Sequence, residues 1–238
     1  TNFTQDHLDY HGDMESYWQA KASLFDWPGL RAAVINHDEP KAQGLLQHCQ
    51  ERGLRCWTYS VERAASVYAQ EVLFSSAGAS FVVQVAEQRF TLNLPLYGLY
   101  NISNVLGVIA TLLSLGVAAQ DAVAACSQLQ AVPGRMELLH RPDWPVAVVD
   151  YAHTPDALEK ALQALRPIAQ SAGGRLWLVF GCGGNRDGSK RALMGAAAEA
   201  GADEIILTSD NPRDEDPQAI AQAVLSGMQR SVRRLELD

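Results

Sequence analysis

The feature that most constrains the fold is a series of three short apolar runs in the C-terminal half of the chain. The runs cover residues 146–150, 176–180 and 204–208, about thirty residues apart. Segments with helical periodicity follow each of them, at residues 155–169, 191–200 and 216–228. Apolar strands that alternate with amphipathic helices are typical of parallel βαβ units. We therefore predict an α/β protein whose C-terminal domain is Rossmann-like, with a mainly parallel sheet.

The N-terminal half has a different pattern. Residues 14–25 have helical periodicity, and one face of that helix carries Met14, Tyr17, Trp18, Leu24, Phe25 and also Lys21. Alternation at 81–86 and 90–94 predicts a hairpin. The remaining predicted elements are strands at 32–36 and 56–60 and helices at 41–52, 98–115 and 119–129. The pattern changes near Gly134, so we predict two domains, residues 1–134 and 135–238.

Composition argues against certain kinds of partner, although an acidic chain can still carry a local basic pocket. The 238 residues carry a formal net charge of −8 without a long basic run, which argues against a nucleic-acid or anionic membrane partner. Four cysteines without metal-like spacing predict free thiols in a reducing cytoplasm. We expect a monomer. The chain begins without Met and ends as a further strand starts, so we interpret it as a piece of a longer protein.

Polar side chains follow each of the three predicted strands. They lie at residues 150–153, 181–191 and 210–213. In open parallel sheets, ligands bind outside the carboxyl ends of the strands. Three such clusters at one sheet edge therefore predict a single binding site.

The glycine-rich loop at 181–191 has two interpretations. Its glycines could expose backbone N–H groups to a phosphate, or they could form a flexible connection. The order of Ser189 and Lys190 does not match a Walker A loop. Arg186 and Arg191 favour an anion site, because guanidinium groups pair with carboxylates and phosphates.

The tetrapeptide Asp210-Asn211-Pro212-Arg213 could be a helix-entry turn, since Asp and Asn cap helices and Pro fixes φ. That role leaves Arg213 without an anionic partner. A carboxylate, an amide and a guanidinium within four residues can bind both the ammonium and the carboxylate of an amino acid. We therefore predict an amino-acid site here.

Other candidates come from the first half of the chain. His7 lies in a polar segment before the helix that carries Lys21, and Lys21 either extends to solvent or is buried. A buried neutral lysine can take up CO2 as a carbamate, an oxygen ligand suited to Mg2+. Asn101 and Asn104, one helical turn apart, could cap a helix or bind an adenine edge. Arg135, at the proposed boundary, is a surface residue or a nucleotide contact.

Six motifs in this order resemble the Mur ligases, and within them the MurE subfamily, over essentially the whole chain. They are DHLDYHGDMESYWQAK, YNISN, PGRME, VVDYAHTPDALEKAL, FGCGGNRD and DNPR. The resemblance implies an ATP-dependent ligase of peptidoglycan synthesis that adds meso-2,6-diaminopimelate to UDP-N-acetylmuramoyl-L-alanyl-D-glutamate through an acyl phosphate. Residues 1–134 would be part of the central ATPase domain, and residues 135–238 would be the amino-acid-binding domain.

The resemblance also implies roles for individual residues. Lys21 would be carbamylated and would hold Mg2+ together with His7. Asn101, Asn104, Arg135, Asp150 and His153 would serve the nucleotide. The amino acid would be bound by Arg186, Arg191, Asp210, Asn211, Pro212 and Arg213, and the arginine that ends DNPR would select diaminopimelate.

Some features of the family pattern are missing. The phosphate loop, the UDP-binding domain, a catalytic glutamate and a final GKGHE-type segment are absent from the sequence, and Asn185 replaces a frequent Asp. We therefore expect residues 1–238 alone to lack ligase activity. The alternatives are a MurF-like or folylpolyglutamate-synthase-like ligase, and a non-catalytic module that binds a nucleotide or an amino acid.

Overall fold

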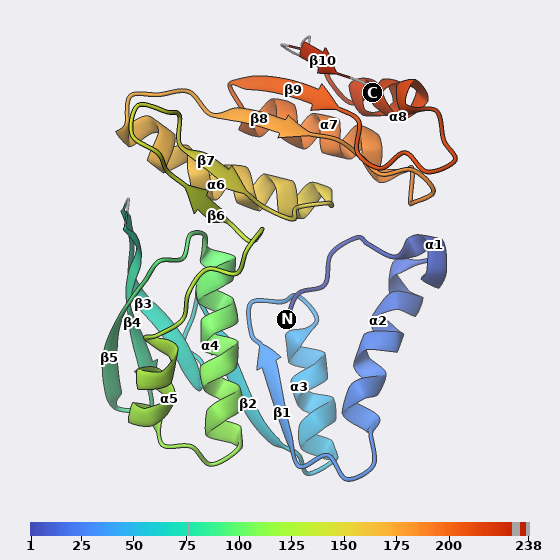
Figure 1. Cartoon of the computed structure of the whole chain (residues 1–238). Coiled ribbons are helices and arrows are strands. Elements are labelled where there is room, and N and C mark those ends of the chain that lie inside the picture. The colour runs from blue at the N-terminus through green and yellow to red at the C-terminus, as the bar shows by residue number, and fades with distance from the viewer. Residues whose placement is uncertain (76, 230–233, 237–238) are drawn as a thin grey trace. The chain divides into compact units, whose positions relative to one another are not determined.

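The computed structural model describes residues 1–75, 77–229 and 234–236. The chain divides into two compact units (Figure 1). Unit 1 contains Thr1–Phe3 and Trp18–Val149, and unit 2 contains Thr4–Tyr17 and Asp150–Asp238. The predicted boundary at Gly134 stays a prediction. No helix in the described ranges is long and apolar enough to cross a membrane.

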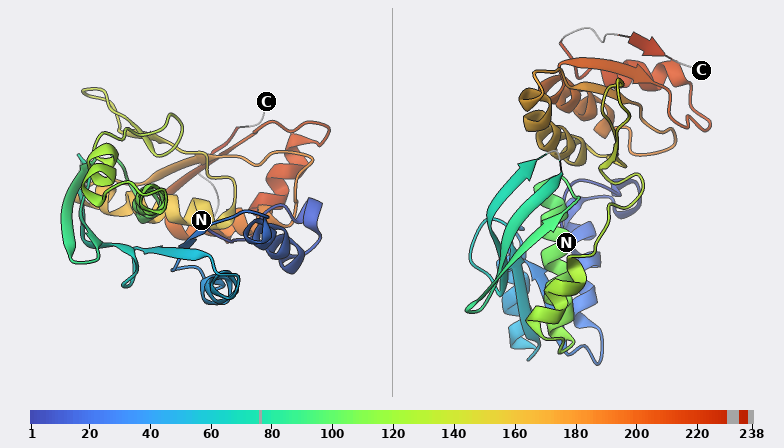
Figure 2. Two further views of the ribbon diagram at one scale, coloured as in Figure 1. Left: turned by 90° about the horizontal axis from the view of Figure 1, so that it is seen from below. Right: turned by 60° about the vertical axis from the view of Figure 1, so that its left-hand side comes forward.

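Unit 1 is built on a five-stranded mixed sheet in the order β1-β2-β3-β4-β5. The first three strands are parallel, and β4 and β5 are antiparallel to their neighbours. The strands are β1 (Ala32–Asn36), β2 (Arg55–Ser60), β3 (Val67–Ser75), β4 (Gly78–Val85) and β5 (Gln88–Leu94). The helices are α3 (Ala42–Glu51), α4 (Leu99–Ser114) and α5 (Ala119–Cys126). Figure 2 shows α3 and α4 on opposite faces of this sheet.

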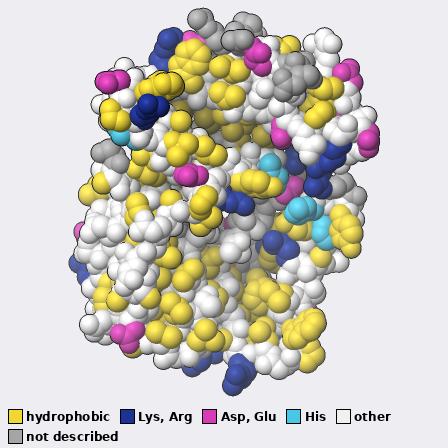
Figure 3. All heavy atoms as spheres, viewed as in Figure 1, with side chains coloured by type: hydrophobic (Ala, Val, Ile, Leu, Met, Phe, Trp, Pro, Cys, Tyr) yellow, Lys and Arg dark blue, Asp and Glu magenta, His cyan; other side chains and the backbone are white. Residues whose placement is uncertain are grey.

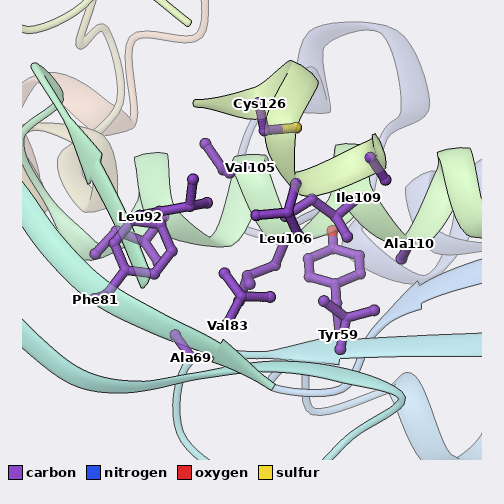
Figure 4. Close-up of a cluster of buried hydrophobic side chains, with 14 of the residues drawn as sticks. Tyr59, Ala69, Phe81, Val83, Leu92, Val105, Leu106, Ile109, Ala110 and Cys126 are labelled. Atoms are coloured by element: carbon purple, nitrogen blue, oxygen red, sulfur yellow. The ribbon is translucent and has the colours of Figure 1, made fainter. Parts of the chain in front are cut away.

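The main core of unit 1 lies between α4 and the strands (Figure 4). Leu106 and Ile109 of α4 are completely buried and share one cluster with Phe81 and Val83 of β4. Their i, i+3 spacing puts both on one helical face, while alternate residues of β4 share one face of the sheet. The predicted hairpin and both predicted helices are therefore confirmed.

Strand β3 was not predicted from the sequence. Val67 and Ala69 are buried, but the pairing register with β4 shifts between Gln70 and Leu73. Glu71 has a φ of 53° at this bulge. A bulge reverses which side chains face the core, so the alternation on which a strand prediction depends is lost after four residues.

Unit 2 contains a parallel sheet in the order β10-β9-β8. Its strands are β8 (Trp177–Phe180), β9 (Glu204–Thr208) and β10 (Arg234–Glu236), and its helices are α6 (Pro155–Ser171), α7 (Lys190–Gly201) and α8 (Pro217–Leu225). Leu158, Met194, Leu207 and Val224 bring the three helices and β9 into one core. The predicted α/β class with a parallel C-terminal sheet is confirmed.

The first of the three apolar runs does not join that sheet, so this part of the prediction was wrong. The run forms β7 (Ala147–Val149), which pairs antiparallel with β6 (Glu137–Leu139) in a separate two-stranded sheet. Its side chains are not buried: Val146 is 52% exposed and Val149 is 44% exposed. Hydrophobic composition predicted a strand here, but it could not predict the partner strand.

The helix predicted at 14–25 is divided. Helix α2 (Met14–Ala22) follows the short α1 (Leu8–His11), and a 3-10 turn, η1 (Ser23–Asp26), completes the segment. Met14, Tyr17, Trp18 and Lys21 are all half-buried, as the predicted stripe requires, but no residue of α2 is fully buried. Leu24 was assigned to the stripe and is instead 61% exposed, because the 3-10 turn changes the angle between successive side chains.

Candidate functional site

Two loops leave the same edge of the parallel sheet in unit 2. The first, here called the glycine loop, is residues 181–191 after β8, and the second, the DNPR loop, is residues 209–216 after β9. Parallel strands end at the same edge, so the loops are neighbours. The Gly184 N–H donates to Asn211 O at 3.1 Å, and Arg213 Nη1 donates to Gly184 O. The predicted clusters at 181–191 and 210–213 are thus joined in the structure.

The glycines of the first loop permit this close approach. A Cβ at Gly184 would overlap the carbonyl oxygen of Pro212, and one at Gly181 would overlap that of Thr208. Neither glycine has a positive φ, so it is the space that excludes a side chain. From the sequence, the glycines could serve a phosphate site or a flexible connection. The structure adds a third explanation for them, which is backbone packing against the DNPR loop.

A partly buried ion pair links the two loops. Arg191 Nη1 and Nη2 donate to the two carboxylate oxygens of Glu215, each at 2.8 Å. Arg191 Nη2 also donates to Gly183 O at 3.3 Å, and Glu215 Oε1 accepts from the Asn185 N–H at 2.5 Å. The hydrogen bonds from Arg191 and from Asn185 lower the pKa of Glu215 to about 2. Arg191, predicted as a substrate contact, therefore has a protein partner.

The other predicted amino-acid ligands are more accessible. Asp210, Asn211, Arg213 and Arg186 are exposed, and Pro212 is half-buried. Arg213 has a φ of 53°, so its backbone lies in the left-handed region. Arg186 makes no hydrogen bond or ion pair with any residue that the structure describes. These exposed cationic groups can bind a carboxylate.

The cavity beside the DNPR loop is too small for an amino acid. It has a volume of about 10 Å³ and is lined by residues that include Asp210, Pro212 and Ile220. A space of this size holds one water molecule. This cavity is therefore not the place where an amino acid would bind.

A second cluster in unit 2 centres on Asp6. Its Oδ2 lies 3.3 Å from His153 Nε2 and 3.5 Å from His7 Nε2, and its Oδ1 lies 3.7 Å from Lys190 Nζ. Burial raises the pKa of Asp6, but the His7 N–H and the positive charges around it lower the pKa by more. In Figure 3, basic side chains, including histidines, gather on the right-hand part of unit 2. The structure thus brings together the predicted residues His7 and His153.

The metal prediction rests on His7 and Lys21, which lie in different units. Lys21 is half-buried in α2, and His7 is exposed at the start of α1 with a φ of 56°. In residues 1–75, 77–229 and 234–236, no three His, Cys, Asp or Glu side chains gather as a metal site. Mg2+ does not need such a cage, because it is commonly held by one or two protein oxygens together with substrate phosphates.

The predicted nucleotide contacts differ in their surroundings. Asn101 Nδ2 donates to Tyr97 O at 2.8 Å, a local bond at the start of α4. Asn104 and Arg135 are exposed in unit 1. Asp150 is half-buried in unit 2, where its Oδ1 accepts from the Ala152 N–H at 2.9 Å. The side chain of Asn101 is thus held by the chain just before α4, whose N-cap is Gly98, and the side chain of Asn104 faces solvent.

Three residues of these clusters were not predicted: Glu215, Asp6 and Lys190. All three are charged residues in or beside loops, where sequence alone predicts solvent exposure. Glu215 could have been found from the sequence, because Arg191 ends the first predicted cluster, Glu215 follows the second, and the two residues carry opposite charges. No comparable signal connects Asp6 with His153, which lies 147 positions further along the chain.

Comparison with known families decides the relationship. The profile described as "Mur ligase middle domain" matches residues 1–112, and "Mur ligase, glutamate ligase domain" matches residues 134–236. The chain belongs to the Mur ligase family. The resemblance stated from the six motifs is confirmed.

Two relatives within the Mur ligase family are similar to this chain over almost its whole length. The chain is 53% identical over 227 residues to the UDP-N-acetylmuramoyl-L-alanyl-D-glutamate–2,6-diaminopimelate ligase of Acidovorax sp., covering 95% of the chain and 45% of the relative. It is 50% identical over 237 residues to the enzyme of that name from Ralstonia nicotianae, covering 96% of the chain and 46% of the relative. The chain thus spans about half the length of these relatives.

Solved structures of Mur ligases match the fold. A structure of a UDP-N-acetylmuramoyl-L-alanyl-D-glutamate–2,6-diaminopimelate ligase is 39% identical with a TM-score of 0.63, covering 99% of this chain and 48% of that one. MurF from Acinetobacter baumannii is 18% identical with a TM-score of 0.77, covering 99% of this chain and 49% of that one. The second match shows a shared fold alone.

Proposed function

We propose that the protein carrying this chain is an ATP-dependent ligase that adds meso-2,6-diaminopimelate to UDP-N-acetylmuramoyl-L-alanyl-D-glutamate in peptidoglycan synthesis. The observation that carries the proposal is the joined pair of loops after β8 and β9, with exposed Arg186 and Arg213. The names and identities of the relatives support the substrate.

The proposed reaction has two steps. ATP phosphorylates the γ-carboxylate of the D-glutamate residue, and ADP leaves. The amine of diaminopimelate then attacks the acyl phosphate, the new amide bond replaces the bond to phosphate, and inorganic phosphate and a proton are released. The chemistry requires that the amine be held close to the acyl phosphate, since orientation supplies much of the acceleration in such reactions.

The loops of unit 2 would hold the amino acid. Arg213 and Arg186 would pair with carboxylates of diaminopimelate, and Asp210 and Asn211 would bind its ammonium and polar groups. The second carboxylate distinguishes this substrate from lysine, which carries an amine but no carboxylate at the corresponding end. A guanidinium pairs with that carboxylate, whereas in lysine it would meet only the like-charged ammonium, so it can supply selectivity.

The nucleotide and the metal ion belong to the same proposal. Asn104, Arg135, Asp150 and His153 would contact ATP, and Asn101 would hold the start of α4. A carbamate on Lys21 and His7 would hold Mg2+, which supplies charge neutralisation for the phosphates when bound. The free thiols of all four cysteines are compatible with a reducing cytoplasm.

The test compares meso-diaminopimelate with L-lysine in the full-length protein, with and without Arg213→Ala. We expect the wild type to prefer diaminopimelate and the variant to lose roughly ten- to a hundredfold in kcat/KM for it, the value of one charge-assisted hydrogen bond. Arg175→Ala is the control, because Arg175 pairs with Glu204 at the opposite end of β8 and β9. Equal use of lysine by the wild type would contradict the proposal.

A further inference from the structure

We propose that Arg191 and Glu215 are positioning residues for the amino-acid substrate. Their ion pair holds the glycine loop and the DNPR loop in the relative position at which Arg186 and Arg213 can bind one ligand. The inference rests on the proposed function, and it assigns Arg191 to a different role from direct contact with the substrate.

The contacts of the pair surround one residue of the glycine loop. Arg191 bonds to the carbonyl of Gly183, and Glu215 bonds to the N–H of Asn185. Gly184, between them, contributes its N–H and its carbonyl to two further hydrogen bonds with the DNPR loop. The ion pair therefore fixes the peptide groups on both sides of the point where the loops meet.

Arg186 and Arg213, the two arginines proposed to bind the substrate, lie close in sequence to the residues that these bonds hold. Arg186 is the residue after Asn185, whose N–H is held by Glu215. Arg213 lies two residues before Glu215 and donates to Gly184 O. Loss of the carboxylate of Glu215 would remove its bonds to Arg191 and Asn185 and leave the loops joined at Gly184 and by Asn185 Nδ2 to Asp214. The spacing between the two exposed guanidinium groups would then be less firmly fixed.

The burial of Arg191 argues against its direct contact with substrate. Its side chain is 9% exposed, and both η nitrogens are engaged by Glu215. A substrate carboxylate would have to displace a bidentate partner and then leave Glu215 without its cation. Arg186 and Arg213 are exposed and need no such exchange.

The pair is also more than a source of stability. Desolvation of the buried Arg191 guanidinium offsets part of the attraction within the pair, and solvent screens Glu215, whose side chain is 35% exposed, so the pair is a weak stabiliser. Another ion pair of unit 2 provides the comparison: Arg166 Nη1 lies 2.6 Å from Asp203 Oδ2, and Asp203 also accepts from the Leu176 N–H. That pair lies where β8 and β9 begin, away from the two loops.

The experiment is a double-mutant cycle in the full-length ligase, with Arg191→Ala, Glu215→Ala and the double variant. The measured quantities are KM for meso-diaminopimelate, KM for ATP, KM for the UDP-linked dipeptide, and kcat. We expect each single variant to raise KM for diaminopimelate by about tenfold or more, as loss of supporting contacts does at other sites. The other two KM values should change little, and the double variant should resemble either single variant.

Two further variants separate the explanations. Asp203→Ala is the matched control, and it should lower thermal stability without a change in KM for diaminopimelate. Glu215→Gln keeps an oxygen for the Asn185 N–H and should recover part of the loss. It also replaces Glu215→Ala in the cycle where the alanine variant does not fold.

The outcomes are distinct. An unchanged KM for diaminopimelate in the Glu215 variants, with an active wild type, overturns the inference. A rise in Arg191→Ala alone, or additive effects in the double variant, means that Arg191 contacts the substrate itself. If the wild-type enzyme does not use diaminopimelate, that result contradicts the proposed function and not the positioning role.

Discussion

Replacement of Gly184 by Ala tests whether the two loops must pack backbone to backbone. The new Cβ would overlap Pro212 O and would lie 3.2 Å from Pro212 Cα. The DNPR loop would have to retreat by roughly 1 to 2 Å before these atoms reach van der Waals separation. Both backbone contacts of Gly184, to Asn211 and from Arg213, would lengthen beyond hydrogen-bonding distance.

The expected size follows from that displacement. Overpacking of this kind costs about 1–3 kcal/mol of stability. A shift of about 1 Å in a binding group can cost roughly a hundredfold in rate. We therefore expect Gly184→Ala to raise KM for diaminopimelate by at least about tenfold.

Gly188→Ala is the matched control in the same loop. The nearest atom to its added Cβ is Arg191 Nη1 at 3.9 Å, which is ordinary contact. Activity should be unchanged, and a small gain in stability is expected because alanine restricts the unfolded chain. The assay is steady-state kinetics of both full-length variants with thermal unfolding as a check. Wild-type kinetics in Gly184→Ala would refute the packing argument.

Two further predictions concern charge and core packing. Glu215 has a pKa of about 2, below its ordinary 4.5, so its stabilising effect is complete above pH 4.5 and disappears as the pH falls toward 2. Urea unfolding should therefore show a difference between wild type and Glu215→Gln that shrinks over this range, and a constant difference would argue against the ion pair. Leu106→Ala should cost about 3 kcal/mol because Leu106 is fully buried in α4. Val108→Ala, at a position 45% exposed on the same helix, should cost far less in the same denaturation assay.

The sequence predicted most elements because their hydrophobic patterns are local. Strands β1 and β9 have the predicted bounds, since apolar side chains fill both runs. Strand β3 was missed because its bulge at Glu71 interrupts the alternation. Strand β7 was assigned to the wrong sheet because partner choice depends on contacts far along the chain.

Some residues of the candidate site could likewise be predicted from the sequence, and others could not. Exposed arginines in motifs, such as Arg213, could be named from the sequence because their chemistry requires a partner. Glu215 and Asp6 could not, because an acidic loop residue in an acidic chain is expected to be solvated. Arg191 was named, but its partner was not, so the sequence could not distinguish contact with substrate from support of the loops.

The discontinuity of unit 2 has a consequence for the order of folding. Thr4–Tyr17 belongs to this unit, although 132 residues of the other unit follow before Asp150. Gln5 bonds to Ser189 at a separation of 184 residues, and Asp6 meets His153 at 147. Closing such loops is entropically costly and slows folding. During synthesis, Asp6 has to wait until residue 190 has left the ribosome before it can complete its contacts with His153 and Lys190.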